Sequence, residues 1–420
     1  MTTFEIKEEF LLKGKTFKIL SGAIHYFRIP PCDWEHSLYN LKALGFNTVE
    51  TYVPWNLHEP QKGEFHFEGI LDLERFLTIA QDLGLYAIVR PSPYICAEWE
   101  FGGFPSWLLR EPIHIRRNEI AYLEHVADYY DVLMKRIVPH QLNNGGNILM
   151  IQIENEYGSF GEEKEYLRAI RDLMIKRGVT VPFFTSDGPW RATLRAGSMI
   201  EDDILVTGNF GSKAKDNFNS MKQFFKEYDK NWPLMCMEFW DGWFNRWKEP
   251  IIQRDPQELA EAVKEVLEQG SINLYMFHGG TNFGFMNGCS ARGVIDLPQI
   301  TSYDYGAPLD EQGNPTEKYY ALRKMIHDNY PEIKQLDPVI KPTIEKKKIS
   351  LTNKVSLFAT LDTISQPVQS KYPKTMEELG QNTGYLLYRT MIERDAEEER
   401  LRVIDGRDRS QLFLLSLIHI

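Results

Sequence analysis

Short apolar runs alternate with amphipathic helical patterns along most of the chain. The runs are almost continuously apolar, which is typical of strands that are buried on both faces of a sheet. The amphipathic patterns have the helical period, and several of them end at a glycine, a common stop signal of a helix. The expected strands span residues 17–26, 48–55, 86–95, 147–158, 181–186, 204–210, 234–240 and 272–277. The expected helices span residues 34–44, 71–83, 119–137, 163–176, 192–195, 220–228, 255–270 and 316–329.

This series of strand and helix units predicts an α/β fold, a parallel (β/α)8 TIM barrel over residues 1–337. A doubly wound open sheet is the competing α/β architecture, but no G-x-G-x-x-G turn follows the first expected strand. Catalytic residues of such barrels come from the C-terminal ends of the strands and the loops after them. We therefore expect the active site at that rim.

The pattern changes after residue 337. Pro338, Pro342 and the lysines at 346–348 predict a linker, and residues 349–361 and 385–391 are typical of strands with no helix between them. Residues 338–420 are thus expected to form a linker and a partial all-β domain. One or two strands cannot bury the apolar end at 412–420, so we expect this β-rich domain to be incomplete and the chain to be C-terminally truncated.

Composition narrows the function class. Of 420 residues, 43% are hydrophobic and 25% are charged, as in globular proteins, and the net charge of -11 argues against nucleic acid as a partner. No run approaches the length of a membrane span, and the first ten residues mix charged with apolar residues, unlike a signal peptide. The cysteines are scattered, which predicts reduced thiols and a cytoplasmic location; they are Cys32, Cys96, Cys236 and Cys289.

Two of the expected strands present glutamates at their C-terminal ends. The run at 147–158 is apolar until it reaches Glu154, Asn155 and Glu156, and the run at 234–240 carries Glu238. Buried carboxylates must be paired, hydrogen-bonded or reactive, because burying an isolated charge costs several kcal/mol. Glu156 and Glu238 would share one rim, which predicts two-carboxylate chemistry. A separation of about 5 to 5.5 Å between the two carboxyl groups would let one of them act as a nucleophile in a retaining reaction. A separation of ~6.5 to 9.5 Å would leave room for a water molecule between them.

Aromatic and polar residues gather at the other strand ends. Aromatic faces beside polar groups suit a sugar, which stacks its C–H face and directs its hydroxyls into hydrogen bonds. The alternative is that these side chains only fill the mouth of the barrel. They are Tyr52, Trp55, Asn56, residues 94–99, Trp240, Trp243 and Tyr275.

The segment Gln152-Ile-Glu-Asn-Glu-Tyr-Gly158, with two glycines at 145–146, resembles the active-site signature of glycoside hydrolase family 35, the β-galactosidases. The resemblance covers most of residues 4–335 and includes segments 21–26, 51–60, 90–99, 238–240, 273–277 and 301–305. It is to bacterial members, and it implies a retaining exo-β-galactosidase that acts on terminal non-reducing β-D-galactose. Some bacterial members favour β-1,3-linked galactose, and no residue here decides that preference.

The resemblance also implies the roles of individual residues. Glu156 would be the general acid/base, Glu238 the nucleophile, and Asn155 the partner of the sugar 2-hydroxyl. Two departures are visible: Asn147 stands where the family usually has proline, and Trp240 stands where relatives often have tyrosine. Trp240 is expected to contact the sugar or the aglycone. The remaining pocket residues that the resemblance implies are Tyr52, Cys96, Ala97, Glu98, Tyr275 and Tyr303.

Two further charged residues are candidates for supporting roles. Glu154 is expected to lie on the same strand face as Glu156 and to brace the site through hydrogen bonds rather than to react. Arg90 is a candidate cation that holds Glu238 ionised, with a structural ion pair as the alternative.

No metal is expected, because the histidines are too scattered for a metal motif. Hydrolysis by two carboxylates needs no cofactor. A sugar-binding barrel without turnover is a second hypothesis, and a metal-dependent barrel enzyme that uses the same acids as ligands is a third. The expected partner is a β-galactoside substrate, and a homo-oligomer stays an open option. The histidines considered are His25, His58 and His278.

Overall fold

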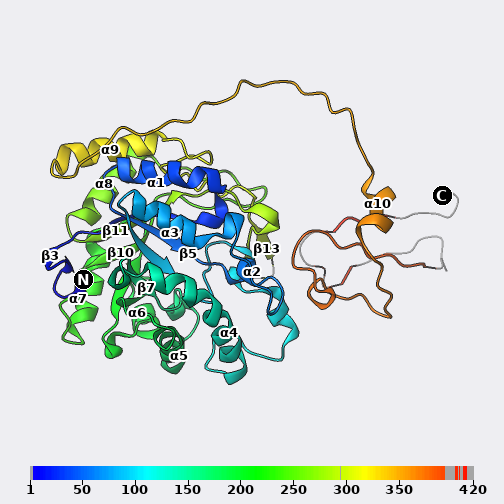
Figure 1. Cartoon of the computed structure of the whole chain (residues 1–420), viewed down its shortest axis with the longest axis horizontal. Helices are drawn as coiled ribbons and strands as arrows, with labels where there is room; N and C mark the ends of the chain where they lie inside the picture. Colours follow the sequence, from blue (N-terminus) through cyan, green and yellow to red (C-terminus); the bar gives the residue numbers. More distant parts are fainter. Residues whose placement is uncertain (1–2, 294, 393–402, 405, 407–409, 414–420) are drawn as a thin grey trace.

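The computed structural model describes residues 3–293, 295–392, 403–404, 406 and 410–413. Within them, eight parallel strands form a closed barrel in the order β10-β11-β4-β5-β6-β7-β8-β9 (Figure 1). The prediction of a (β/α)8 barrel is therefore confirmed. Its strands are β4 Leu20–Ile24, β5 Thr48–Tyr52, β6 Tyr86–Arg90, β7 Ile148–Gln152, β8 Phe183–Asp187, β9 Leu205–Asn209, β10 Met235–Trp240 and β11 Ser271–His278.

Each barrel strand is followed by a helix that packs outside the sheet (Figure 1). These helices are α1 Trp34–Ala43, α3 Leu73–Asp82, α4 Ile120–Ile137, α5 Lys164–Ile175, α6 Arg191–Gly197, α7 Ala214–Lys226, α8 Pro256–Leu267 and α9 Glu317–Asn329, with the short α2 Trp55–His58 in the loop after β5. The 3-10 helices are η1 Tyr26–Arg28, η2 Pro31–Asp33, η3 Gly69–Leu71, η4 Glu100–Gly103, η5 Ser106–Arg110, η6 Val138–His140, η7 Leu142–Asn144, η8 Tyr157–Ser159, η9 Ile200–Asp202, η10 Phe283–Phe285 and η11 Glu377–Leu379.

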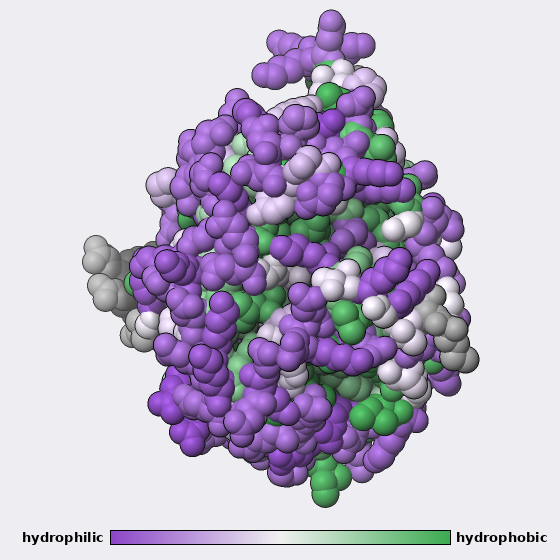
Figure 2. All heavy atoms as spheres, turned by 90° about the vertical axis from the view of Figure 1, so that its left-hand side faces the viewer, coloured by the Kyte–Doolittle hydropathy of each residue, from purple (hydrophilic) through white to green (hydrophobic). Residues whose placement is uncertain are grey.

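The outer helices form because their apolar residues recur on one face. In α3 the buried residues are Leu73, Phe76, Leu77 and Ala80, at the spacing of one helical stripe. The predicted start of α8 is confirmed, since Asp255 Oδ1 accepts hydrogen bonds from the backbone of residues 257 and 258 at 2.9 Å. The opposite helix faces are polar, and the side of the molecule in Figure 2 is largely hydrophilic with scattered apolar residues. None of the helices in the described part of the chain combines the length and apolar composition needed to cross a bilayer.

The interior of the barrel changes from apolar to polar along the strands. Ile88 of β6 belongs to an apolar cluster at the N-terminal end, and Arg90, the next inward position, is buried among polar groups. Met150 and Gln152 of β7 repeat this change. An antiparallel sheet contributes Phe4 and Phe10 to the apolar cluster. This sheet consists of β1 Phe4–Ile6, β2 Phe10–Leu12 and β3 Lys15–Thr16, and a second small sheet at the rim consists of β12 Cys289–Arg292 and β13 Ile295–Pro298.

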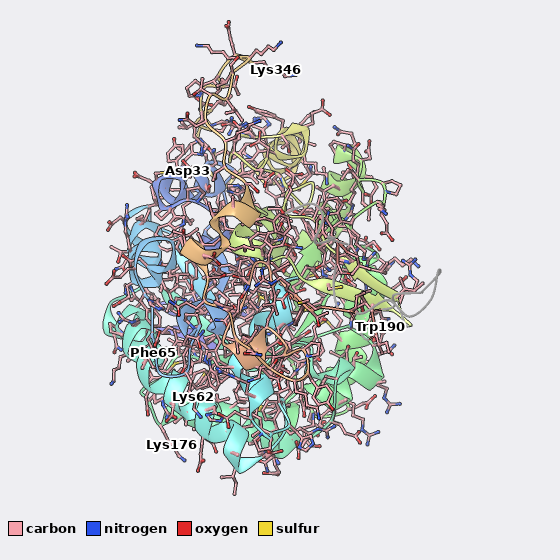
Figure 3. All side chains as sticks on the ribbon, turned by 90° about the vertical axis from the view of Figure 1, so that its right-hand side faces the viewer. Asp33, Lys62, Phe65, Lys176, Trp190 and Lys346 are labelled. Carbon is pink, nitrogen blue, oxygen red and sulfur yellow. The ribbon has the colours of Figure 1, made fainter. Side chains whose placement is uncertain are left out.

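The segment after α9 stays attached to the barrel as far as Lys341. Val339 exchanges backbone hydrogen bonds with the side chain of Asn40, and Lys341 Nζ lies 3.0 Å from Asp33 Oδ1. The chain then leaves this surface, and Figure 3 shows Lys346 at the outer edge of the molecule. The predicted domain boundary at 337 stays a prediction.

The prediction of two strands after the barrel is wrong for the residues that the structure describes. Residues 349–356 and 385–391 form no strand, and residues 357–361 lie in the helix α10 Leu357–Ile364. Their apolar side chains have no sheet to pack on, and Leu351 is 91% exposed. A strand needs a hydrogen-bonded neighbour, which the periodicity of one segment cannot supply. Residues 414–420 of the apolar end lie outside the described residues.

We expect backbone amides of residues 343–356 and 365–374 to exchange hydrogen at least roughly 100-fold faster than those of β5 to β7, because these residues are almost all exposed. Hydrogen exchange followed by mass spectrometry checks this, with α9 as an internal reference from the barrel. Protection of these residues equal to that of α9 would contradict it.

Candidate active site

The residues after β7 form a turn and not an extension of the strand. β7 ends at Gln152, and Glu154 and Glu156 have left-handed backbone angles φ of +56° and +44°. The strand alternation that would place these two glutamates on one face is therefore interrupted. Left-handed backbone is costly for residues other than glycine, so contacts must hold this turn.

The end of β8 holds the turn that carries Glu156. The backbone N–H of Glu156 donates to Ser186 O at 3.1 Å, and that of Gly158 donates to Asp187 Oδ1 at 2.7 Å. A Cβ atom at Gly158 would lie 2.0 Å from Thr193 O, so only glycine fits there. Asp187 is buried, and this burial raises the pKa of its carboxyl well above the usual value.

Glu154 braces this turn from the other side. Its carboxylate accepts two hydrogen bonds from Arg116, both at 2.9 Å, and one from Tyr166 Oη at 3.0 Å. Arg116 also donates to Asn155 O at 2.9 Å. These bonds agree with the bracing role predicted for Glu154. Arg116 could not be recognised as its partner from the sequence, because the arginine comes from a long loop and belongs to no motif.

The amide of Asn155 is oriented by three donors. Its Oδ1 accepts from Tyr52 Oη at 2.9 Å, from Arg90 Nη2 at 2.7 Å and from Gln152 Nε2 at 3.1 Å. Its Nδ2 makes only a long contact of 3.4 Å with Ile95 O. The Nδ2 group therefore keeps donor capacity for a ligand.

Glu238 contacts the same two residues, Arg90 and Tyr52, that contact Asn155. Its Oε1 accepts from Arg90 Nη2 at 2.7 Å and lies 2.8 Å from Tyr52 Oη, whose single proton it shares with Asn155 Oδ1, while Oε2 accepts from Trp240 Nε1 at 3.3 Å. The side chain of Arg90 is fully buried, and its guanidinium lies 4.0 Å from the centre of the Tyr52 ring. The predicted contact between Arg90 and Glu238 is thus present, and it is a charge-assisted hydrogen bond.

An irregularity in β10 directs Glu238 into the barrel. Cys236 pairs with Gly208 and Glu238 with Asn209, so β10 has one residue more than β9 between these pairs. Met237 belongs to the interior cluster. Regular alternation would turn its successor towards the helices, whereas the extra residue lets Glu238 face the interior too.

Glu156 has an environment different from that of Glu238. Its Oε1 accepts from Asn209 Nδ2 at 2.8 Å, and Asn209 Oδ1 accepts from Ser186 Oγ at 2.6 Å. Burial first, and then the charge of Glu238, raise the pKa of Glu156 to about 7, against the weaker opposing effect of Asn209. Asn209, which sequence reasoning missed, is also the ladder partner of Glu238 and so links the two acids.

Left-handed backbone is also found in the loop after β6, which carries the predicted pocket residues 96–98. Cys96, Ala97 and Glu98 have successive φ values of +57°, +53° and +47°. Glu98 accepts a hydrogen bond from Tyr303 Oη, and Tyr303 Oη lies 3.4 Å from Tyr275 Oη. Burial raises the pKa of Glu98 to about 7 and that of the Cys96 thiol to about 12.

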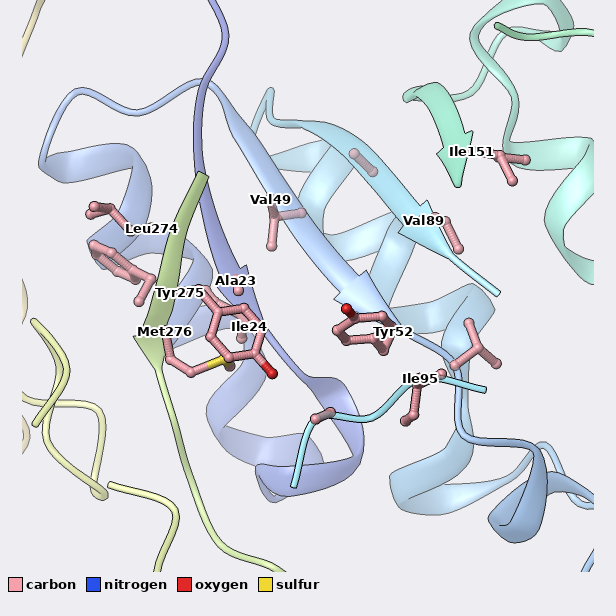
Figure 4. Packing of buried hydrophobic residues seen from close by; sticks show 14 of the residues in the cluster. Ala23, Ile24, Val49, Tyr52, Val89, Ile95, Ile151, Leu274, Tyr275 and Met276 are labelled. Atoms are coloured by element: carbon pink, nitrogen blue, oxygen red, sulfur yellow. The ribbon is translucent and has the colours of Figure 1, made fainter. Parts of the chain in front are cut away.

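Two residues that were not assigned to the site from the sequence, His25 and Arg28, contact several of the predicted pocket residues. The ring of His25 lies 5.3 Å from that of Tyr52, the last residue of β5, and 5.7 Å from that of Tyr275 within β11 (Figure 4). Arg28 donates to Ala97 O, and its guanidinium lies 3.7 Å from the centre of the Tyr303 ring. The predicted pocket residues are therefore brought together by short chains of contacts.

Metal ligation is not indicated in the described part of the chain. There, no group of three or more His, Cys, Asp or Glu residues is arranged to hold a metal ion. His58 Nδ1 instead contacts His66 O at 2.7 Å, and His278 Nδ1 contacts Ser37 Oγ at 2.8 Å. The acids at the mouth have protein hydrogen-bond partners.

Comparison with known proteins identifies related sequences over most of the chain. The model of glycosyl hydrolases family 35 matches residues 9–329. Beta-galactosidase-1-like protein 3 of Mus musculus is 41% identical over 395 residues, which are 92% of this chain and 59% of that protein. Beta-galactosidase of Felis catus is 39% identical over 402 residues (94% and 59%). Beta-galactosidase 8 of Oryza sativa subsp. japonica is 38% identical over 425 residues (97% and 62%).

The chain spans about three fifths of the length of these relatives. They come from two mammals and a plant, and the bacterial source expected from the sequence stays a prediction.

Solved structures support the fold. An exo-beta-1,4-mannosidase from Opitutaceae bacterium strain TAV5 has a TM-score of 0.53 and 15% identity, covering 76% of this chain and 61% of that chain. A beta-galactosidase from the psychrophilic Marinomonas ef1 has a TM-score of 0.50 and 13% identity, covering 74% and 59%. At these identities the likeness shows the fold alone.

We expect Glu154→Ala to lower the free energy of unfolding by about 3 to 5 kcal/mol, because it leaves the buried guanidinium of Arg116 without its carboxylate. Urea denaturation followed by circular dichroism measures this. Glu165→Ala is the matched control, since it removes a largely exposed glutamate that also pairs with an arginine, and it should change stability by less than about 1 kcal/mol. Equal losses in the two variants would contradict a structural role for Glu154.

Proposed function

The chain belongs to glycosyl hydrolases family 35, and from this premise we propose that it is a retaining exo-β-galactosidase that removes terminal β-D-galactose from oligosaccharides or glycoconjugates. The observation that carries the proposal is the contrast between the two acids. Glu238 accepts a charge-assisted hydrogen bond from a buried arginine at 2.7 Å. Glu156 has a neutral amide partner and a pKa raised to about 7. An ionised nucleophile and a protonated acid are what double displacement needs.

In the first step, Glu238 attacks the anomeric carbon while Glu156 gives its proton to the departing oxygen. Oε1 of Glu238 is held by Arg90 at 2.7 Å and Tyr52 at 2.8 Å. Within the described residues its Oε2 accepts only the 3.3 Å bond from Trp240, so Oε2 is the oxygen that we expect to attack. The bond to the sugar forms as the bond to the aglycone breaks.

In the second step, Glu156 is ionised and takes a proton from water, which attacks the anomeric carbon and releases Glu238. The Nδ2 group of Asn155, which makes a long contact with Ile95 O, is positioned by the three donors near its Oδ1, and we assign its remaining donor capacity to the sugar 2-hydroxyl. Such a bond contributes most if it strengthens in the transition state.

The wall formed by Cys96, Ala97, Glu98, Tyr275 and Tyr303 is assigned to the remaining galactose hydroxyls and to the sugar face. Turnover of a chromogenic β-galactoside by the purified chain separates this proposal from a barrel that binds galactosides without hydrolysis. Disaccharides that differ only in linkage test the preference for β-1,3-linked galactose. The cytoplasmic location stays a proposal, which fractionation of producing cells tests.

We expect kcat/KM for a galactosyl disaccharide to be maximal below about pH 7 and to fall above it, because Glu156 must be protonated to act as the acid. Steady-state kinetics from pH 5 to 9 measure this limb. For a dinitrophenyl galactoside, whose leaving group needs little protonation, the limb should be weak in the wild type and absent in Glu156→Gln. Glu98→Gln is the matched control: the pKa of Glu98 is also raised to about 7, yet its loss should leave the limb in place. A limb that moves only in Glu98→Gln would contradict the assignment of Glu156.

We expect azide to rescue the two acid variants with opposite stereochemistry. In Glu156→Gln, the glycosyl-enzyme from a dinitrophenyl galactoside should accumulate, and azide should release β-galactosyl azide without needing a base. In Glu238→Gln, azide should replace the nucleophile and give α-galactosyl azide. Turnover of disaccharides by Glu156→Gln should fall by about 10² to 10⁴-fold.

Proton NMR of the azide products identifies their anomers. Glu154→Gln serves as the control, because this acid neighbours the site without a proposed chemical role, and azide should not rescue it. Opposite anomers would reverse the assignment, and rescue of Glu154→Gln would move the acid/base to that residue.

A further inference from the structure

A third carboxyl, that of Glu50, is buried beneath the nucleophile. It lies on β5 at the inward position before Tyr52, and its side chain is fully buried. Its nearest cation is Arg90, whose Nη1 lies 3.7 Å from Glu50 Oε1, and Asn273 Nδ2 contacts its Oε2 at 3.5 Å. Both distances are too long for strong hydrogen bonds. Burial, outweighing the opposing charge of Arg90, raises the pKa of this carboxyl to about 7.

Arg90 stands between two acids. Its Nη2 lies 2.7 Å from Glu238 Oε1, while its Nη1 is directed at Glu50 and, in the described part of the chain, has no hydrogen-bond partner. Among these residues, Arg90 forms ion pairs with Glu238 and Glu50 alone. One ionised carboxylate balances one guanidinium, so in the resting enzyme below neutral pH the closer Glu238 carries the charge and Glu50 the proton.

The proposed reaction disturbs this balance. When Glu238 bonds to the anomeric carbon, its carboxylate becomes a neutral ester. Glu156 ionises in the same step, because it gives its proton to the leaving group, but its carboxylate is hydrogen-bonded to Asn209 and not to Arg90. The fully buried Arg90 therefore loses the carboxylate that contacts it, which is unfavourable for a buried cation. In the described part of the chain, Glu50 is the other carboxyl paired with Arg90, and its ionisation, with the proton released to solvent, gives Arg90 a counter-charge at close range.

We propose that Glu50 is a positioning residue that replaces Glu238 as the counter-charge of Arg90 while the sugar is covalently bound. The inference rests on the proposed double displacement. The groups that face Glu50 are Arg90 from β6, Glu238 from β10, the amide of Asn273 from β11 and Tyr52 from its own strand. The charge of Glu238 raises the pKa of Glu50, so this pKa falls when the ester forms.

The pKa of Glu50 in the two states determines how formation of the glycosyl-enzyme depends on pH. At acid pH, Glu50 is protonated both in the resting enzyme and in the glycosyl-enzyme, and glutamine imitates it. As pH rises, Glu50 ionises in the glycosyl-enzyme first, which favours that state. Each unit by which the pKa of Glu50 falls corresponds to about a tenfold gain. The wild type should therefore form the glycosyl-enzyme increasingly faster than Glu50→Gln as pH increases.

The experiment uses 2-deoxy-2-fluoro-β-galactosyl fluoride, which traps the glycosyl-enzyme because its second step is slow. The second-order rate constant of inactivation is measured for both proteins between about pH 5 and pH 8, and mass spectrometry counts the adducts. We expect the ratio of wild type to Glu50→Gln to rise from near one to about tenfold or more. Glu156 is common to both proteins, so its titration cancels in the ratio.

Glu50→Asp is the matched variant, since it shortens the side chain but keeps a group that can ionise. Its ratio to wild type should vary less with pH than that of Glu50→Gln. The slope with pH is diagnostic and not the absolute rate, so Glu50→Met carries the same test if the glutamine variant does not fold. A ratio that is constant with pH would reduce Glu50 to a packing role and overturn the inference alone. Failure of the wild type to form any adduct would overturn the proposed function as well.

Discussion

The site depends on one buried cation, Arg90. Its guanidinium contacts Tyr52 of β5, Gln152 at the end of β7, Asn155 in the turn after it and Glu238 of β10. A charge buried to this degree is stable only if its partners are fixed, so the arginine and its partners determine each other's positions. The barrel makes this arrangement possible because its parallel strands end at one rim. The polar mouth and the apolar floor are consecutive layers of the same strands.

The division of labour that we propose for the two acids rests on their neighbours. Both acids face the same interior, but Glu238 accepts hydrogen bonds from Arg90 and Tyr52, whereas Glu156 accepts one from the amide of Asn209. A carboxyl beside a cation favours its charged form, and one that is buried beside another negative charge favours its proton. Glu156 follows a left-handed turn after β7 and contacts Asn209 of β9, whereas Arg90 contacts Glu238. Burial, which is unfavourable for most carboxyl groups, thus supports the acid role that we propose for Glu156.

The sequence predicted the barrel well because its strands are buried on both faces and its helices on one, so periodicity alone separates them. It also predicted the rim positions of Glu156 and Glu238. It missed Arg116 and Asn209, since contacts between distant strands leave no local pattern, and it placed Glu154 in a regular strand where the backbone turns. The strands expected after residue 349 were wrong for a related reason: a strand is specified by its neighbours as much as by its own residues.

The central claim is that Glu238 forms a covalent bond to the sugar and Glu156 serves both steps, which requires the anomeric configuration to be retained. Proton NMR of the galactose released in the first minutes from a β-galactoside tests it most directly, because mutarotation is slow on that scale. The account predicts that the β-anomer appears first and the α-anomer only later, by mutarotation. Initial release of the α-anomer would mean a single displacement by water, and it would contradict the account.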